Sequence, residues 1–333
     1  MKLRTIFGSL LAIVTGIFCS AADPAAPGWH QVPMTHLHAG KARQYTIHYY
    51  LPKHGNPAKM PVLIVMHGAG GGEKGKNPGE CWKKLAEEQG FVVIAPAYPV
   101  KDYPAAAYQH AGISRTWDKL DLLPKEEWTA MTVEKAFDLV REEAKLEAKD
   151  YYLYGMSAGG QFVHRFLLAV PEARVRRAVL ASPGTWTFPC LDGKLDDSGN
   201  VYDWPVSMRD VPDAEKNLKA ALQRDVVVIL GTADNKKINP SKNPDHGFMT
   251  TPGALAEGAG RCDRGKNAFA AAKRTAEQLN VPFNWKLIVL DDVTHSNFQV
   301  IRGDAVSIKG LPYRNQCKPN GAFHQLFHDV PQQ

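Results

Sequence analysis

Three residues of this chain carry the groups that acyl transfer to a serine requires. Ser157 supplies a hydroxyl, His295 an imidazole and Asp234 a carboxylate. A serine hydroxyl is a poor nucleophile until a base removes its proton, and a neutral imidazole has a suitable pKa for that step. The carboxylate fixes the imidazole tautomer and stabilises the imidazolium that forms. Together the three side chains predict hydrolysis through a covalent serine intermediate.

The serine has a sequence context that suits a nucleophile. Ser157 is the centre of a G-x-S-x-G pattern between an apolar run at 151–154 and a helix-like segment at 161–169. A strand, turn and helix in this order place the serine on a strained turn, where a side chain on either glycine would collide with its neighbours. The N–H of Ala158 then faces a developing oxyanion at the positive end of the helix. Taken alone, the pattern also fits a strand-to-helix turn with a chance serine.

The two partner residues follow strand ends. Asp234 comes just after an apolar run at 225–230, and His295 comes shortly after one at 285–290. The carboxyl ends of parallel strands lie at one edge of a sheet, where open α/β folds build their sites. We therefore expect Ser157, Asp234 and His295 to converge there, in that chain order.

Each partner has a rival in the sequence. Asp291 or Asp292 could replace Asp234 as the acid, although the acid is expected after the preceding strand. His246 could replace His295 as the base, although it lies in an irregular stretch rich in proline and glycine. Order, spacing and strand ends favour the first assignment.

A glycine-rich loop, residues 67–72, follows the apolar run at 61–66. It contains neither G-x-G-x-x-G nor a Walker lysine-serine pair, so nucleotide binding is not indicated. Bare backbone N–H groups at this edge of the sheet would instead suit an oxyanion. The alternative is a flexible glycine loop.

Strands alternate with helices along the chain, which predicts an α/β fold with a mostly parallel sheet and helices on both faces. The first two strands read as an edge hairpin. The expected strands are 29–38, 43–51, 61–66, 91–95, 151–154, 177–181, 225–230 and 285–290. The expected helices are 79–89, 124 or 126 to about 148, 161–169, 214–223 and 266–278.

No linker divides the chain, so we expect one domain over residues 23–333, with a lid-like insertion at about 185–213 and a tail at about 300–333. The insertion carries Trp186, Phe188 and Trp204. These aromatic side chains either line a substrate cleft or form a small core of the insertion.

The N-terminus resembles a secretory signal. Residues 1–22 combine a basic start, an apolar run at 6–18 and small residues for cleavage. The apolar run is short for a membrane anchor. Cys19 follows Phe18 rather than a small residue, which argues against a lipoprotein. We expect a secreted or periplasmic protein that has no membrane contact after signal removal.

Four cysteines remain after such a signal, and an even number in an exported chain fits two disulfides. The four cysteines can pair in three ways. We favour the bond Cys262–Cys317, which would tie down the C-terminal tail and leave Cys81 and Cys190 as the other two.

The charges and histidines point to no further ligand. The formal net charge is +6, but the basic residues are spread along the chain, so no nucleic-acid partner is expected. His36 and His38 alternate in a strand without a third ligand nearby, which argues against a metal site. The chemistry above requires no cofactor, and the sequence makes no prediction of oligomeric state.

These motifs together resemble the α/β-hydrolases, nearest to secreted esterases of the polyhydroxybutyrate depolymerase and feruloyl or acetylxylan esterase type. The resemblance covers about residues 43–300. It implies a nucleophile at Ser157, an acid at Asp234 and a base at His295. It also implies an oxyanion hole formed by the N–H groups of Ala158 and of the loop at Ala69 and Gly70. No polymer-binding module is recognisable, which argues against a solid polymer substrate.

The sequence therefore predicts a secreted serine carboxylic ester hydrolase that acts on small or oligomeric esters without a cofactor. A serine peptidase of the prolyl-oligopeptidase type shares the triad, although no propeller-sized N-terminal domain is present. A non-catalytic binding protein on the same fold is the third possibility, against which the intact triad argues.

Overall fold

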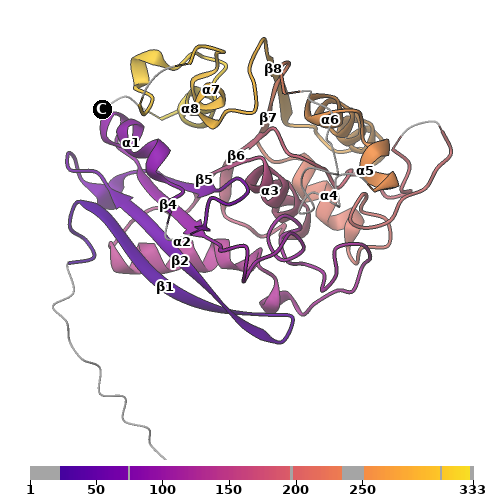
Figure 1. The fold of residues 1–333 in the computed structure, drawn as a ribbon, viewed down its shortest axis with the longest axis horizontal. Coiled ribbons are helices and arrows are strands. Elements are labelled where there is room, and N and C mark those ends of the chain that lie inside the picture. Colours follow the sequence, from indigo (N-terminus) through magenta and orange to yellow (C-terminus); the bar gives the residue numbers. More distant parts are fainter. Residues whose placement is uncertain (1–22, 74–75, 196–197, 235–250, 308–309, 331–333) are drawn as a thin grey trace, which may run out of the picture.

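An eight-stranded sheet organises the molecule, with its strands in the order β1-β2-β4-β3-β5-β6-β7-β8. The computed structural model describes residues 23–73, 76–195, 198–234, 251–307 and 310–330. β1 and β2 form an antiparallel hairpin at one edge, β2 pairs antiparallel with β4, and the later neighbours are parallel. Figure 1 shows β1 at the lower left and β8 at the top, near the middle of the view. The strands are β1 (Gly28–His38), β2 (Lys41–Leu51), β3 (Val62–Met66), β4 (Val92–Ala97), β5 (Tyr151–Met156), β6 (Val175–Ala181), β7 (Val226–Gly231) and β8 (Trp285–Leu290).

The predicted mostly parallel sheet and edge hairpin are thus confirmed. Every residue of β3 and of β7 is buried. A strand covered on both faces must be apolar at each position, which explains why both segments appear in the sequence as uninterrupted apolar runs.

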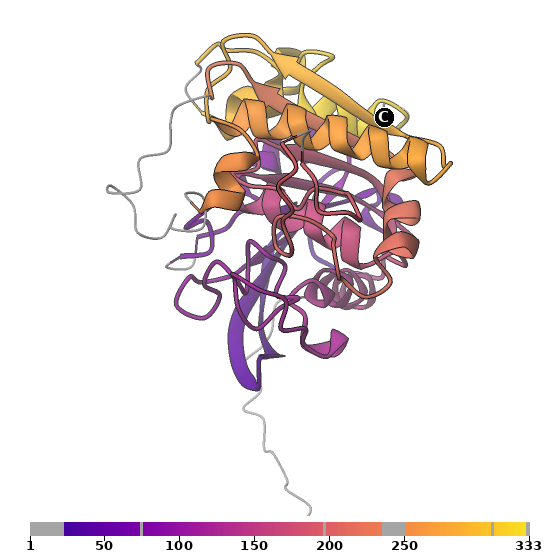
Figure 2. The ribbon, with the colours of Figure 1, turned by 90° about the vertical axis from the view of Figure 1, so that its right-hand side faces the viewer.

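Helices cover both faces of this sheet (Figures 1 and 2). One face carries α2 (Met131–Glu143), α3 (Ala158–Ala169), α4 (Ala214–Leu222) and α6 (Arg261–Gln278). The opposite face carries α1 (Lys83–Gln89), α7 (Asn297–Arg302) and α8 (Ala322–Phe327). The shorter elements are η1 (Pro57–Lys59), η3 (Glu80–Trp82), η4 (Lys125–Glu127), α5 (Pro252–Ala256) and η7 (Arg314–Gln316).

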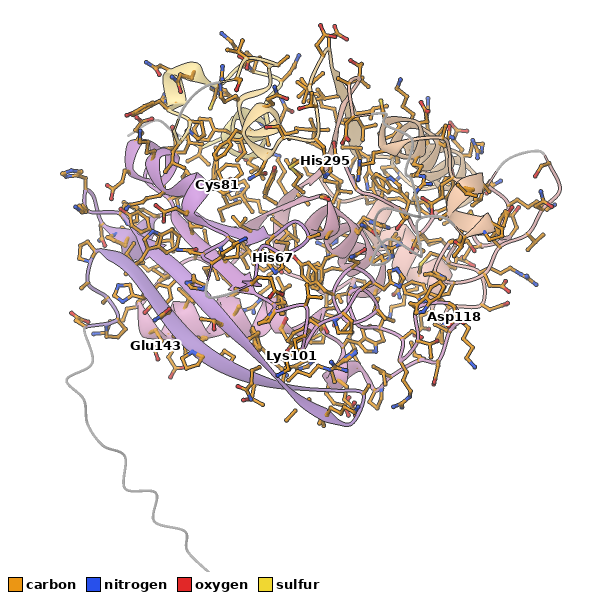
Figure 3. The ribbon with its side chains drawn as sticks, viewed as in Figure 1. His67, Cys81, Lys101, Asp118, Glu143 and His295 are labelled. Atoms are coloured by element: carbon orange, nitrogen blue, oxygen red, sulfur yellow. The ribbon has the colours of Figure 1, made fainter. Side chains whose placement is uncertain are left out.

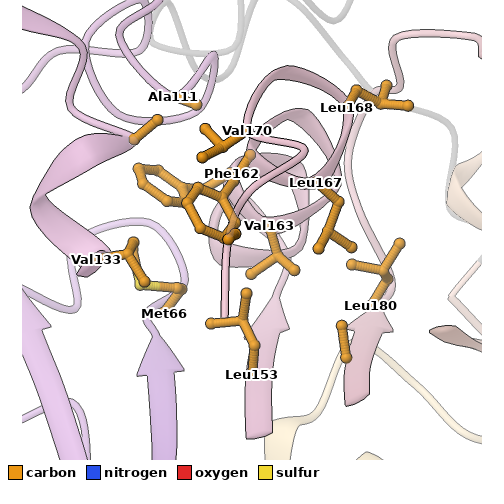
Figure 4. Packing of buried hydrophobic residues seen from close by; sticks show 14 of the residues in the cluster. Met66, Ala111, Val133, Leu153, Phe162, Val163, Leu167, Leu168, Val170 and Leu180 are labelled. Atoms are coloured by element: carbon orange, nitrogen blue, oxygen red, sulfur yellow. The ribbon is translucent and has the colours of Figure 1, made fainter. Parts of the chain in front are cut away.

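Each face has its own cluster of buried side chains, because successive residues of a strand point to opposite faces. On β5, Leu153 belongs to the first cluster, whereas Tyr152 and Tyr154 belong to the second. Figure 4 shows Phe162 and Val163 of α3 above Leu153, in the first cluster. This packing fixes α3 directly behind the turn that carries Ser157.

Several predicted boundaries differ from the structure, among them the start of the helix expected at 266–278, which begins at Arg261. The helix expected at 79–89 begins as the 3₁₀ turn η3 and continues as α1. The long helix expected to reach about residue 148 is the 3₁₀ turn η4 followed by α2, which ends at Glu143. The strand expected at 91–95 extends to Ala97, so Pro96 lies inside β4. The pairing of β4 with β3 extends only to Ile94, so the missing N–H of the proline interrupts no ladder with β3.

The predicted disulfides are not formed, and the four cysteines in the described part of the chain are free thiols. Cys262 lies in α6 on one face of the sheet, whereas Cys317 belongs to the cluster on the other face. The favoured Cys262–Cys317 pair is therefore wrong in this structure, because the sheet separates the two residues. Burial raises the pKa of Cys190 and that of Cys317 to about 12.

The signal predicted at residues 1–22 lies outside the described residues. Within the described ranges, the helices are all too short or too polar to span a bilayer.

Candidate active site

The turn that carries Ser157 is strained and closely packed. Ser157 has φ 57° and ψ −116° at the junction of β5 and α3. A Cβ atom on Gly155 would lie 2.3 Å from the carbonyl oxygen of Gly159. One on Gly159 would lie 2.0 Å from the carbonyl oxygen of Met66 in the neighbouring strand β3. Only glycine fits at either position, which accounts for the two glycines of the G-x-S-x-G pattern.

Ser157, His295 and Asp234 lie in one hydrogen-bonded row. Nε2 of His295 is 2.9 Å from Oγ of Ser157, and Nδ1 of His295 is 2.7 Å from Oδ2 of Asp234. An ionised carboxylate only accepts, so Nδ1 carries the proton and donates it to Asp234, and Nε2 accepts from the serine hydroxyl. The side chain of Asp234 is 3% exposed and that of His295 is 33% exposed. The structure thus brings together the three side chains that the sequence singled out, with the histidine open to a substrate.

Arg261 completes the hydrogen bonding of the buried carboxylate. Its Nη1 donates to Oδ1 of Asp234 at 3.1 Å, and its side chain is 15% exposed. Asp234 therefore accepts from His295 on one oxygen and from Arg261 on the other, through hydrogen bonds in which charge adds strength. Arg261, the first residue of α6, holds the carboxylate in the orientation that His295 requires.

The rival residues do not join this row. Asp291 and Asp292 are exposed, and across the described residues neither carboxylate has a hydrogen bond to His295. The row therefore favours Asp234 as the acid. His246, the rival base, lies outside the described residues.

The glycine-rich loop after β3 is held by His67. The backbone N–H of Tyr98 donates to Nε2 of His67 at 3.1 Å, and Nδ1 of His67 donates to the carbonyl oxygen of Gly68 at 2.7 Å. The imidazole must be neutral to make both bonds, and burial lowers the pKa of His67 to about 4. Its ring also stacks on Tyr108, with the centroids 4.5 Å apart. A Cβ on Gly71 would lie 2.6 Å from Cβ of His67, so the loop packs directly onto this histidine.

The three predicted oxyanion donors lie at the start of α3 and in the loop after β3. Ala158 is the first residue of α3, so its N–H has no acceptor within the helix. Ala69 lines the cavity beside Ser157. Gly70 is not among the lining residues: it has φ 70° within a turn that the N–H of Gly71 closes onto the carbonyl of Gly68 at 3.0 Å. Gly70 therefore shapes the loop, since a positive φ favours glycine.

A cavity of about 530 Å³ opens beside Ser157, which is a size that suits a small-molecule ligand. Figure 3 labels three of its residues: Cys81 and His295 in the upper half of the view, and His67 below them. The lining residues come from β3 and the loop after it, η3, β5 and its turn, α6, the loop after β8 and the start of α7: Val65, Met66, His67, Gly68, Ala69, Gly71, Lys76, Asn77, Pro78, Cys81, Tyr154, Met156, Ser157, Arg261, His295 and Asn297.

A polar link in the cavity wall joins the nucleophile strand to the histidine loop. The hydroxyl of Tyr154 donates to Oδ1 of Asn297 at 2.6 Å, and Nδ2 of Asn297 donates to Sγ of Cys81 at 3.3 Å. Burial raises the pKa of Cys81 to about 12, so this thiol is neutral and is not a second nucleophile at neutral pH.

The three aromatic residues proposed to bind substrate lie elsewhere. Trp186, Phe188 and Trp204 are 0%, 1% and 3% exposed and belong to the buried cluster on the α3 face. None of them lines the cavity beside Ser157. Phe188 borders a separate cavity of about 460 Å³ between the insertion and α6. Of the two roles that the sequence left open, their burial agrees with a core, but this core is the cluster on the α3 face and not a separate one within the insertion.

Sequence reasoning missed Arg261, Tyr154, Asn297 and Lys76. Asn297 stands two residues after His295, and Tyr154 three residues before Ser157, so proximity to the motifs could have suggested both. Lys76 follows the glycine-rich loop by four residues, whereas Arg261 is far from every motif and only the folded chain brings it to the cavity.

Comparison with known proteins is consistent with this geometry. The dienelactone hydrolase family matches residues 47–252, which is more than half of the chain. Among curated proteins, a bifunctional acetylxylan esterase/xylanase from Neocallimastix patriciarum is 26% identical over 140 residues. That match covers 42% of this chain but only 18% of the relative.

Two solved structures align along most of their length. Poly(aspartic acid) hydrolase-1 from Sphingomonas sp. KT-1 is 33% identical with a TM-score of 0.69, over 81% of this chain and 94% of that protein. A poly(3-hydroxybutyrate) depolymerase from Bordetella parapertussis has the same TM-score at 24% identity, over 82% of this chain and 87% of that protein, and shows the shared fold. The chain therefore belongs to the dienelactone hydrolase family and is a hydrolase with the α/β-hydrolase fold.

Proposed function

We propose that this protein is an exported serine carboxylic ester hydrolase that works through an acyl-enzyme on Ser157. The observation that carries the proposal is the hydrogen-bonded row in which His295 lies 2.9 Å from Ser157 and 2.7 Å from Asp234. Family membership supports a hydrolase, and the partial match to an esterase supports an ester substrate.

In the first half-reaction, Oγ of Ser157 attacks the ester carbonyl while Nε2 of His295 takes the hydroxyl proton. The negative oxygen of the tetrahedral intermediate is stabilised by the N–H groups of Ala158 and Ala69. His295 then returns the proton to the departing alkoxide, and the alcohol leaves. Asp234 stays ionised and stabilises the imidazolium throughout.

In the second half-reaction, water takes the place of the alcohol. His295 removes a proton from the water as it attacks the acyl carbon, and it gives that proton to Oγ of Ser157 as the bond between this oxygen and the acyl carbon breaks and the carboxylic acid leaves. The exposed part of the His295 side chain lets water reach Nε2 once the alcohol has gone.

Hydrolysis of p-nitrophenyl acetate and p-nitrophenyl butyrate by the purified mature protein tests this proposal. We expect turnover by the wild type and loss of turnover in Ser157→Ala. A fluorophosphonate probe should label the wild type and not the variant. Turnover that survives Ser157→Ala would remove the nucleophile assignment. No turnover together with no labelling would favour a binding protein on the same fold.

Amide hydrolysis is the second candidate, because one relative is named for poly(aspartic acid), a polymer joined by amide bonds. The same triad can cleave amides when the leaving amine is protonated by the histidine. Matched ester and anilide substrates separate the two activities. An anilide cleaved faster than its ester would assign the protein to the amidases.

Export is supported by the sequence of residues 1–22. N-terminal sequencing of the protein recovered outside the cytoplasm should begin close to residue 22 or 23. A full-length chain retained in the cytoplasm would contradict export.

A further inference from the structure

The loop that carries His295 follows β8, which is an edge strand of the sheet. Two hydrogen bonds tie this loop to the one after β7. The N–H of Ala233 donates to the carbonyl oxygen of Val293 at 3.1 Å. The N–H of Asp292 donates to the hydroxyl of Thr232 at 2.8 Å. Both bonds end at least two residues before the base, so the residue next to the base needs other contacts to fix it.

The side chain of Gln299 holds the residue that precedes the base. Its Oε1 accepts from the backbone N–H of Thr294 at 2.9 Å and from the hydroxyl of Thr294 at 2.8 Å. Its Nε2 donates to the carbonyl oxygen of Ala305 at 2.7 Å. A backbone N–H can only donate and a carbonyl can only accept, so these partners determine which end of the amide is the oxygen. Thr294 is thus tied twice to a side chain whose orientation is fixed.

Gln299 lies in the short helix α7, and its backbone is anchored there. Its N–H donates to the capping hydroxyl of Ser296 at 3.5 Å. Its carbonyl oxygen accepts from the N–H groups of Gly303 at 2.7 Å and Asp304 at 3.2 Å, where the helix ends. The next residue, Val300, is fully buried in the cluster that packs α7 on the sheet. The amide therefore projects from an element that is itself held in place, as a group that orients another must.

His295 lies between two residues that are held by side chains. Gln299 bonds to Thr294 before it. The hydroxyl of Tyr154 bonds to Asn297 after it. A displacement of about 1 Å in a catalytic group can cost about a hundredfold in rate, so a base in a loop depends on such contacts. Gln299 does not line the cavity beside the nucleophile, and the bonds of the imidazole in the described part of the chain go to other residues. Its influence on the reaction therefore passes through Thr294.

We infer that Gln299 is a positioning residue for the base, and that it acts through its two hydrogen bonds to Thr294. This inference rests on the proposed ester hydrolysis, because it names a residue that keeps His295 in place for that reaction. Activity should follow the bonds between Gln299 and Thr294, whereas the bond from Gln299 to Ala305 should contribute little.

Three variants separate these bonds in the hydrolysis of p-nitrophenyl butyrate. Gln299→Met keeps the length of the side chain but removes the amide, so kcat should fall about tenfold with little change in KM. Thr294→Val removes the hydroxyl but keeps the backbone N–H, so kcat should fall about threefold. Gln299→Glu can accept from both donors of Thr294 but cannot donate to Ala305, so its kcat should stay within about twofold of the wild type.

Gln316→Met is the matched control. The Oε1 of Gln316 also accepts from a nearby backbone N–H, that of Tyr313 at 3.0 Å, but it lies in η7 and does not line the cavity. Its kcat should equal that of the wild type. A wild-type kcat in Gln299→Met, or a loss in Gln299→Glu as large as that in Gln299→Met, would overturn the inference. If Gln299→Met does not fold, Thr294→Val decides, because it removes a single exposed hydroxyl: a wild-type kcat in that variant would also overturn it.

An NMR measurement separates failure of the inference from failure of the proposed function. The ¹⁵N shifts of labelled histidine show which ring nitrogen of His295 carries the proton when the ring is neutral, and that is set by the bond of Nδ1 to Asp234. The wild type, Gln299→Glu and Gln316→Met should hold the proton on Nδ1, whereas Gln299→Met should move part of it to Nε2. If this pattern appears but no ester is hydrolysed, the positioning role stands and ester hydrolysis falls. A proton that stays on Nδ1 in Gln299→Met would overturn the positioning role, because the imidazole would still face Asp234.

Discussion

The hydroxyl of Tyr154 donates to Oδ1 of Asn297 at 2.6 Å, which joins the strand of the nucleophile to the loop of the base. Tyr154 precedes Ser157 by three residues, and Asn297 follows His295 by two. The two segments are thus connected twice, once by this bond and once by the contact between Ser157 and His295. The first connection involves neither Oγ of Ser157 nor the imidazole of His295, so we expect it to hold the base near the nucleophile when the catalytic contact breaks.

Tyr154→Phe tests this positioning role. The change leaves Asn297 without its donor, so we expect kcat for p-nitrophenyl butyrate to fall about tenfold with little change in KM. Tyr152→Phe is the matched control, since it removes a hydroxyl from the same strand whose partner is Asp329, outside the cavity. Equal kcat losses in both variants would reduce Tyr154 to a structural residue.

Asp234→Asn tests the acid. The amide can still pair with His295, but it favours the wrong tautomer and cannot stabilise the imidazolium, so kcat should fall by about 10⁴. Asp291→Asn and Asp292→Asn remove the rival carboxylates, which are exposed, and should leave kcat within about twofold of the wild type. If Asp234→Asn stays active and either control loses most of its kcat, the acid would be the residue changed in that control.

The parts of the fold that were predictable are those in which the sequence of a short segment reveals whether its residues are buried. The apolar runs that became β3 and β7 are buried at every position, so their sequences report a two-sided environment. The turn at Ser157 was predictable because a Cβ atom on either of its two glycines would lie too close to backbone atoms, so the sequence must have glycine at both positions.

The parts that were not predictable depend on relations between distant segments. The number of cysteines does not reveal on which face of the sheet each one lies, and Cys262 and Cys317 lie on opposite faces. Aromatic residues in an insertion look alike whether they pack inward or line a cleft, and Trp186 is fully buried. Arg261 reaches Asp234 only because α6 begins beside the end of β7.

Gly159→Ala tests the packing of the nucleophile turn by stability. Its Cβ would lie 2.0 Å from the carbonyl oxygen of Met66, which is part of a central strand and cannot move freely. We expect the free energy of unfolding to fall by about 3 kcal/mol or more, as measured by urea denaturation. Gly68→Ala is the control, because its Cβ meets its nearest atoms at 3.7 Å and should change stability by less than about 1 kcal/mol. Similar stability of the two variants would contradict the packing argument.

The stability of the protein should fall in mild acid, in part because of His67. Burial lowers the pKa of His67 from 6.5 to about 4, since the folded state favours the neutral ring. Above pH 6.5 neither state binds this proton, so the contribution is fully present. Between pH 6.5 and about 4 only the unfolded state binds it, so stability falls by about 1.4 kcal/mol per pH unit for this one group.

Urea denaturation at intervals from pH 7 to pH 4 measures this slope. His67→Gln can still pair with the backbone of Tyr98 and Gly68 but cannot take up a proton. The slope of its free energy of unfolding against pH should therefore be smaller than that of the wild type by the contribution of one proton, about 1.4 kcal/mol per pH unit. His30→Gln is the control, because His30 is only half-buried, bonds to a backbone carbonyl and lies away from this loop. A slope unchanged in His67→Gln would mean that the ring is already protonated in the folded state, and the neutral contact with the N–H of Tyr98 would then be wrong.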